Sequence, residues 1–170
     1  MGILSGNQQD EPMHYGEVFA VWSSLAAAQS QQTACEVYYN HAGDDDLKQF
    51  ISDMVQDVVK PSIKETEQLL KVNEVTLPPA PPERADASRQ EIPQGARILD
   101  PEISAALAKD ITTGLVADSQ IIGQATREDI AALFARFHME KVQMGQRLLR
   151  INKEKGWLLT PPLHVEKVKQ

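Results

Sequence analysis

A long proline-rich stretch in the middle of the chain most constrains its fold. Residues 73–99 hold five of the ten prolines and separate two segments of similar length, each with the periodicity of a helix pair. A connection this long is unusual inside a compact domain unless it must span a distance. A helix of about 26 residues is about 39 Å long, whereas about 27 residues, partly in polyproline conformation, reach about 80 Å. The sequence therefore predicts an all-α four-helix bundle in which residues 73–99 form a long crossover between helices 2 and 3.

The net charge and the cysteine content limit which partners and which cell compartment we expect for this protein. The 170 residues carry 24 acidic and 17 basic side chains, a net charge of −7, which argues against a nucleic-acid partner because phosphate binding needs a basic surface. No apolar run approaches the ~18 residues of a membrane span, and no secretory signal is recognisable. Cys35 is the single cysteine, so no disulfide within the chain is possible. We expect a cytoplasmic protein in which Cys35 is a small buried hydrophobe.

The chain divides into an arm, a bundle and a tail. We expect residues 1–13 to form a polar N-terminal arm, residues 14–156 to form the bundle, and residues 157–170 to form an apolar C-terminal tail. Two prolines keep the tail out of any helix or sheet, and its leucines need a surface to lie on. We therefore expect a homodimer to which residues 157–163 contribute buried surface, or an equivalent contact within one chain.

The first helix is expected over residues 15–40. Residues at three- and four-residue spacing define one face: Val18, Trp22, Leu25, Gln29, Gln32, Glu36 and Tyr39. This face is apolar at its start and polar further on. Either its second half lines a polar interior, or the buried face turns toward Val21, Ala28 and Cys35; the second interpretation is favoured.

The second helix follows a glycine stop at Gly43 and is expected to be capped by Asp44, Asp45 and Asp46. Pro61 lies inside it and predicts a kink, after which the helix continues to about Val72. The expected buried stripe is Leu47, Phe50, Ile51, Met54, Val58, Glu65, Leu69 and Val72.

The third helix should begin with Asp100 as its cap and Pro101 in the first helical position. Its expected buried stripe is Ile103, Leu107, Ile111, Leu115, Asp118 and Ile122. The fourth helix should be capped by Thr126, with the stripe Leu133, Phe137, Glu140, Met144, Leu148 and Ile151. Gly156 should end it, with Trp157 folding back on Ile151 in a Schellman-type closure.

Several segments resemble a known family: residues 16–22 (GEVFAVW), 41–47 (HAGDDDL), 127–130 (REDI), the proline crossover and 155–162 (KGWLLTPP). The chain resembles a ferritin-like family of unknown function that occurs mainly in endospore-forming bacteria and is distantly similar to spore coat protein F. The resemblance covers nearly the whole chain. It implies a ferritin-like four-helix bundle and a sporulating cell, and it implies no established reaction. Some members carry a histidine in the latter half of helix 2, where Ser62 stands here.

Metal chemistry of the ferritin type needs a Glu-x-x-His pair on each of two helices. This sequence has one such spacing, Glu11 to His14, and it precedes the first expected helix. At the start of that helix the spacing is reversed, as His14-x-x-Glu17. A weaker possibility is that Glu65, Asp118 and His138 hold one divalent metal, iron or manganese. The alternative, which we favour, is that both carboxylates face the flank and that His138 is a hydrogen-bonded core residue.

No glycine-rich phosphate loop, nucleophile elbow or paired-cysteine motif is present in the sequence. The sequence therefore favours a non-enzymatic structural or interaction protein that forms homo-oligomers, needs no cofactor and, by its resemblance, is associated with the spore. The first alternative is a bundle that binds one metal for redox or storage chemistry. A second alternative is a small apolar ligand between the helices.

Overall fold

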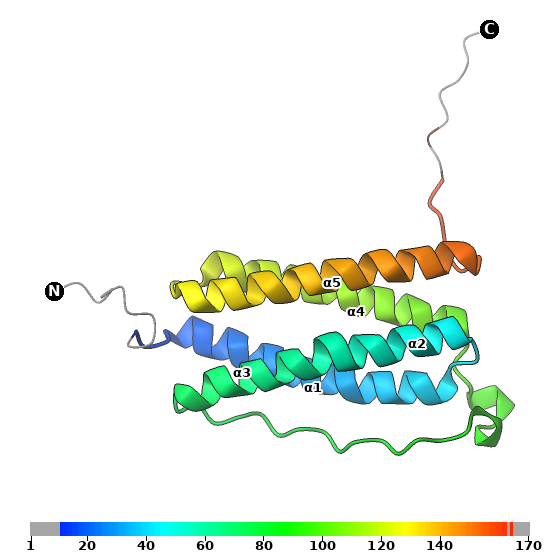
Figure 1. Cartoon of the computed structure of the whole chain (residues 1–170), viewed down its shortest axis with the longest axis horizontal. Coiled ribbons are helices and arrows are strands. Elements are labelled where there is room, and N and C mark those ends of the chain that lie inside the picture. Colours follow the sequence, from blue (N-terminus) through cyan, green and yellow to red (C-terminus); the bar gives the residue numbers. More distant parts are fainter. Residues whose placement is uncertain (1–10, 163, 165–170) are drawn as a thin grey trace, which may run out of the picture.

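The computed structural model describes residues 11–162 and 164, and every regular element in this part of the chain is a helix. Three elements are single helices: α1 (Tyr15–His41), α4 (Asp100–Gln124) and α5 (Glu128–Glu154). A fourth long helical segment consists of α2 (Asp45–Met54), a π-helical turn (Val55–Val59) and α3 (Lys60–Val72). The four segments lie side by side along one axis (Figure 1). The predicted all-helical architecture is therefore confirmed. None of the described helices combines the length and the apolarity needed to cross a membrane.

The apolar core is split into two clusters, one toward each end of the bundle. The first cluster comprises Cys35, Ala42, Leu47, Phe50, Ile51, Met54, Val55, Val59, Ile103, Leu107, Ile111, Leu148 and Ile151. The second cluster comprises Val21, Leu25, Leu70, Ile121, Ile130, Phe134 and Phe137. Along each long helical segment, the change from one cluster to the other passes through polar side chains that are buried or largely buried. We call these side chains the polar layer: Gln29, Ser62, Thr66, Asp118 and Lys141.

The second helical segment contains a local insertion. In the π-helical turn the backbone N–H of Lys60 donates to the carbonyl of Val55, five residues earlier. Pro61 follows directly and has no N–H to donate. The helix continues past Pro61 to Val72, as predicted, but the inserted residue rotates every later side chain around the axis. The buried positions there are Ser62, Thr66 and Leu70 rather than Glu65, Leu69 and Val72, so that part of the predicted stripe is wrong.

Of the predicted helix caps, the structure confirms the one at Asp44 and contradicts the one at Asp100. Asp44 begins α2 as predicted, and its carboxylate accepts a hydrogen bond from the backbone N–H of Leu47 at 3.1 Å. Asp100 does not cap its own helix, because Leu99 is the N-cap residue of α4. The carboxylate of Asp100 instead accepts a hydrogen bond from the backbone N–H of Gly43 at 2.7 Å. This bond ties the start of α4 to the loop between α1 and α2.

The start of α5 is held by α1, and the prediction that Thr126 caps α5 is wrong. The backbone N–H and the hydroxyl of Thr126 both donate to Glu17 Oε1, at 2.7 and 3.0 Å. The backbone N–H of Arg127 adds a third bond to the same oxygen at 2.9 Å. The guanidinium of Arg127 pairs with Asp129 at 2.6 Å and donates to Asn73 Oδ1 at 2.8 Å. The ends of three helical segments therefore meet around one buried carboxylate and one buried guanidinium.

Val21 and Cys35 lie on the buried face of α1, as the favoured interpretation expected, whereas Ala28 is only half-buried and Gln29 of the other predicted face is buried. The polar side of its second half faces the connection formed by residues 73–99, which runs along the helices from the end of α3 to the start of α4 (Figure 1). Side chains of α1 hold this connection by hydrogen bonds at four points. These bonds join Trp22 to Thr76, Glu36 to Arg84, Asn40 to Ala87, and His41 to Ile98.

The end of α5 is the predicted Schellman closure. Gly156 has a φ of 71°, the left-handed region that favours glycine. The backbone N–H of Trp157 donates to the carbonyl of Asn152 at 2.9 Å, and that of Gly156 donates to Lys153 at 3.4 Å. The Trp157 ring packs against the first cluster, to which Ile151 belongs. Beyond it the chain leaves the helices (Figure 1), and Leu159 is 92% exposed. The predicted contact of the tail within one chain is therefore not made by Leu159.

Candidate functional site in the polar layer

The polar layer contains one buried ion pair, between Asp118 of α4 and Lys141 of α5. The ammonium nitrogen of Lys141 lies 2.7 Å from Asp118 Oδ2, and the Asp118 side chain is only 3% exposed. The stem of Lys141 crosses α4 beside Gly114, where an added Cβ would stand 3.0 Å from two of its carbons. The same ammonium lies 5.6 Å from the centre of the buried Phe137 ring. The lysine stem therefore packs closely against α4 at Gly114 and places its ammonium on the buried carboxylate.

Burial and charge act in opposite directions on this carboxyl group. Burial raises the pKa of Asp118, because the ionised form loses its hydration. The Lys141 ammonium and, more weakly, His138 lower the pKa, but burial dominates and the net shift is upward. The ionised pair is consequently maintained by Lys141, and removing the lysine would leave a buried carboxylate without a cation.

The remaining members of the polar layer are neutral. Ser62 and Thr66 satisfy their hydroxyls within α3, by donating to the backbone carbonyls of Val59 at 2.8 Å and of Ser62 at 2.6 Å. Gln29 of α1 is 6% exposed, and its side-chain oxygen has no hydrogen-bond partner. A cavity of about 10 Å³ lies beside the π-helical turn and has Lys141 in its wall. This volume corresponds to one water molecule at most.

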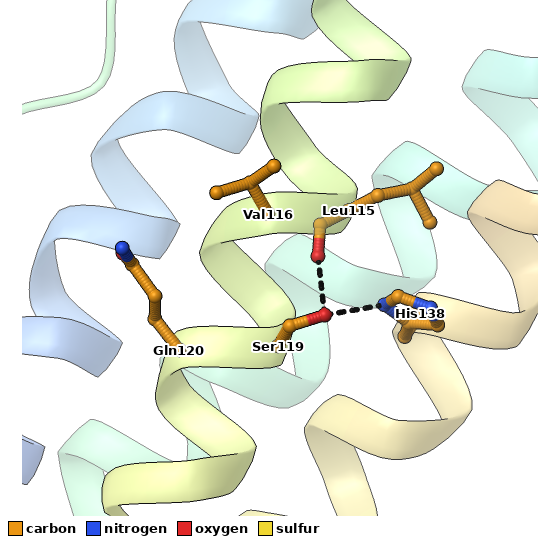
Figure 2. A pocket seen from close by; sticks show the side chains of 5 residues that line it. All are labelled: Leu115, Val116, Ser119, Gln120 and His138. Atoms are coloured by element: carbon orange, nitrogen blue, oxygen red, sulfur yellow. Dashed lines mark hydrogen bonds between the residues drawn. The ribbon is translucent and has the colours of Figure 1, made fainter.

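His138 lies outside the polar layer, in a shallow open hollow between α4 and α5 (Figure 2). We call this feature the α4–α5 hollow; it has a volume of about 370 Å³ and is lined by Leu115, Val116, Ser119, Gln120 and His138. The hydroxyl of Ser119 donates its one proton to the carbonyl of Leu115 at 2.9 Å. Nδ1 of His138 lies 3.4 Å from the same hydroxyl oxygen. This arrangement occupies the imidazole nitrogen that faces α4.

Glu65 lies on the side of α3 that faces the outer edge of α5. Its carboxylate is paired with the guanidinium of Arg136, which also binds Glu140 at 3.1 Å. The inserted residue of the π-helical turn explains this position, because without it Glu65 would share the buried face with Met54. Glu65 and Asp118 are thus neutralised by two different cations on different sides of α5.

The structure does not gather the three predicted metal ligands. Glu65 binds Arg136, Asp118 binds Lys141, and His138 contacts Ser119. Among residues 11–162 and 164, no group of three or more His, Cys, Asp and Glu side chains is placed to share a metal ion. Asp118 and His138 lie close enough to interact electrostatically, but the ammonium of Lys141 is the cation next to that carboxylate. Metal binding by the protein itself stays a prediction.

Sequence reasoning missed the two charged groups that organise the interior. Lys141 lies four residues after Phe137 and seven before Leu148, so helical spacing alone would have placed it on the buried face of α5. For Glu17 the only local signal was the His14-x-x-Glu17 spacing, which corresponds to the bond from the His14 N–H to its carboxylate. Its contact with α5 gave no signal, because Thr126 and Arg127 are more than a hundred residues away in sequence. Burial raises the pKa of Glu17, but the N–H groups of Arg127, Thr126 and His14 outweigh it and lower the pKa overall.

Cys35 has no partner that would activate it. Its thiol is fully buried, and burial, together with the nearby Asp110 and Glu36 carboxylates, raises its pKa to about 12. A thiol with such a pKa is neutral at physiological pH and a poor nucleophile. The structure therefore gives Cys35 the packing role that the sequence predicts.

Two crystal structures are similar to this fold. One is that of a "putative spore coat protein" (BH2358) from Bacillus halodurans C-125, which matches with a TM-score of 0.92 and 49% sequence identity, over 94% of this chain and 100% of that chain. The other is that of the conserved hypothetical protein rv2844 from Mycobacterium tuberculosis, with a TM-score of 0.65 and 12% identity, over 81% of this chain and 98% of that chain. The second similarity concerns the fold alone.

The sequence comparisons agree with the first of these structures. The uncharacterized protein YvdQ from Bacillus subtilis (strain 168) is 48% identical over 167 residues, and the match covers 98% of each chain. The family model described as "Protein of unknown function (DUF3231)" matches residues 1–169. The chain therefore belongs to the DUF3231 family of proteins of unknown function.

Proposed function

We propose that this protein is a non-enzymatic structural or interaction protein of the sporulating cell, built as a ferritin-like bundle with a proline-rich crossover. The observation that carries the proposal is the similarity to the Bacillus halodurans relative at 49% identity, together with its spore-coat designation. At this identity, over 94% of the chain, the surface as well as the core is related in sequence. A shared role in the spore is therefore the simplest inference.

The charged groups of the interior also favour a structural role. The buried carboxylates of Glu17 and Asp118 each have partners within the chain, respectively backbone N–H groups and an ammonium. A carboxylate that acts on a substrate would have to exchange such partners during the reaction, at the expense of the packing around it. We therefore assign both to the stability of the bundle.

Metal binding through Glu65, Asp118 and His138 has less support as a second function. Both carboxylates already have a cationic partner, and the histidine nitrogen that faces α4 contacts a hydroxyl. Elemental analysis of the purified protein distinguishes the two functions. Stoichiometric iron or manganese would favour the metal-binding bundle, and its loss in an Asp118→Asn variant would assign the site.

Localisation in spores tests the proposal directly. The full chain, fused to a fluorescent protein, is produced from a sporulation-controlled promoter in a Bacillus strain, with the fluorescent protein alone as control. We expect the fusion to collect around the developing spore and the untagged chain to be recovered by mass spectrometry in the coat extract of purified spores. A chain that stays dispersed in the mother cell and is absent from the coat extract would overturn the proposal.

A further inference from the structure

Two apolar features of the surface have no partner among residues 11–162 and 164. The first is Leu159 in the tail, which is 92% exposed although it follows the tightly fixed end of α5. The second is the α4–α5 hollow, whose wall includes Val116, itself 56% exposed (Figure 2). An exposed leucine and an open apolar hollow on the same molecule are complementary in chemistry.

Leu159 cannot reach the hollow of its own chain. The backbone N–H groups of Trp157 and Leu158 both donate to the carbonyl of Asn152, at 2.9 and 3.2 Å, and so fix the tail at the end of α5. His138 lies fourteen residues before Asn152 on the same helix, a distance of about 21 Å. The Cα of Leu159 lies about 3.8 Å from that of Leu158. Leu159 can therefore fill this hollow only from another copy of the chain.

A two-fold arrangement makes this exchange reciprocal. In a closed dimer of identical chains, each copy gives its tail and receives that of the partner across a two-fold axis. The two-fold axis must be equally far from the start of the tail at Gly156 and from the hollow at His138. It therefore passes about halfway between them, near Arg147 of α5. Leu149 is a large hydrophobic residue close to this point and is 42% exposed. It follows His138 by eleven residues, about three helical turns, and therefore lies on the same side of α5.

We propose that the protein forms a two-fold homodimer in which Leu159 of each copy fills the α4–α5 hollow of the other, and in which the two Leu149 side chains meet on the axis. The proposal deepens the structural role and rests on it, but its test uses purified protein, so its failure leaves spore association to be judged on spores. Pro161 and Pro162 stiffen the exchanged segment in an extended conformation. A segment that is already extended loses less conformational freedom on docking.

Mass in solution tests both sides of the exchange. The 18.9 kDa chain should sediment as a dimer in analytical ultracentrifugation. Leu159→Asp and Val116→Asp should each raise the dimer dissociation constant at least about tenfold, because each places a charge in an apolar contact. Val72→Asp is the matched control: Val72 is 63% exposed on α3, outside the proposed interface, and its variant should stay dimeric. Circular dichroism verifies that all three variants keep their helix content.

A charge pair adds a rescue experiment. The double variant Val116→Asp/Leu159→Lys should regain dimer, because the lysine of one copy then meets the aspartate of the other. A single-chain mass for the unaltered protein at all concentrations would overturn the proposal. A dimer that survives both single aspartate variants would also overturn it and would place the interface elsewhere.

Cross-linking locates the axis independently. In Leu149→Cys, mild oxidation with copper phenanthroline should join two chains through one disulfide, since a residue on a two-fold axis faces its own copy. The buried Cys35 does not interfere. Val72→Cys is equally accessible to the oxidant and should migrate at the mass of one chain on a non-reducing gel. Equal cross-linking of both variants, or none of Leu149→Cys in a proven dimer, would contradict the proposed axis.

Discussion

The ammonium of Lys141 lies 2.7 Å from the buried carboxylate of Asp118 and is the cation of the polar layer. Lys141→Met should therefore lower the free energy of unfolding by about 3 kcal/mol at pH 7, the low end for breaking a buried pair, because Lys141 keeps 20% of its side-chain surface exposed. The pKa of Asp118 is already raised by burial and should rise further without the lysine. At a pH between the Asp118 pKa of the unfolded chain and its higher pKa in the folded variant, the folded state binds one more proton than the unfolded state. The free energy of unfolding of the variant therefore falls as pH rises through this range.

The measurement is urea denaturation at pH 5 and at pH 7.5, and the loss caused by Lys141→Met should be smaller at pH 5. The matched control is the double variant Asp118→Leu/Lys141→Met, which removes both charges and should recover most of the lost stability. A single variant as stable as the unaltered protein at pH 7.5 would show that the pair contributes nothing.

Glu17→Gln should destabilise the end of the bundle where α1 meets α5. The carboxylate accepts three hydrogen bonds from Thr126 and Arg127, and a neutral amide oxygen accepts them more weakly. We expect a loss of about 2 kcal/mol at pH 7. Because the pKa of Glu17 is lowered on folding, its contribution is present above the unfolded pKa and disappears as pH falls through the folded pKa. The difference between variant and unaltered protein should accordingly shrink toward pH 3.

Glu67→Gln is the control for this variant. Glu67 forms an ion pair with Lys71 at 3.0 Å on the surface of α3, where a pair contributes about 0.5 kcal/mol or less. Thermal unfolding of the two variants at pH 7 should separate them clearly. If Glu17→Gln and Glu67→Gln prove equally mild, then the buried carboxylate does not secure the start of α5.

Local sequence chemistry predicted much of this fold. Local sequence was enough to predict three features: the helical segments, the cap at Asp44 and the glycine closure at Gly156. Each of them depends on neighbours within one or two helical turns. The π-helical turn could not be predicted from the sequence, because one inserted residue leaves the spacing of apolar residues before and after it unchanged. Glu65 was consequently assigned to the buried face, whereas Thr66 occupies it.

The interior charges show a second limit of sequence reasoning. Threonine is a residue type that often caps helices, but in the folded chain the hydroxyl and the backbone N–H of Thr126 both donate to the carboxylate of Glu17. Asp118 lies on the buried face, as the expected stripe had it, and its partner Lys141 was not identified. The favoured alternative, in which Asp118 faces the flank and His138 lies in the core, is wrong for both residues. Which partner a buried charge finds depends on how the helices pack, and a single sequence does not contain that information locally.

Pro61→Ala should fold normally, with a stability similar to or greater than that of the unaltered protein. The π-helical turn already accommodates the missing N–H of Pro61, and alanine is the better helix former by about 3 kcal/mol in a regular helix. The turn should persist because the packing of Thr66 and Leu70 depends on its inserted residue. Urea denaturation and a crystal structure of the variant are the measurements. A loss of more than about 2 kcal/mol would mean that the proline itself organises the turn.

Cys35 should be inert in the folded protein. Its pKa of about 12 leaves a thiolate fraction at pH 8 about a thousandfold below that of an unperturbed thiol, and the side chain is fully buried. A thiol-specific chromogenic disulfide reagent should react at a rate limited by unfolding and should react at once in 6 M guanidinium. Val72→Cys, at a position that is 63% exposed and outside the proposed interface, supplies the exposed control within the same chain. Rapid labelling of Cys35 under native conditions would contradict its burial.

Iron chemistry of the ferritin type should be absent from this protein. A dinuclear centre needs bridging carboxylates and one imidazole for each metal, and the one Glu-x-x-His spacing of this sequence, Glu11 to His14, precedes α1. In the centre of the bundle, the Asp118 carboxylate is held by Lys141, and a bound metal would have to displace that ammonium. Ferrous iron added in air to metal-free protein should therefore oxidise no faster than in buffer, as followed by absorbance near 310 nm. Lys141→Met is the informative comparison, because it frees the carboxylate while adding no imidazole. Faster oxidation by the unaltered protein, or two metals about 3.5–4 Å apart in its core, would refute the prediction.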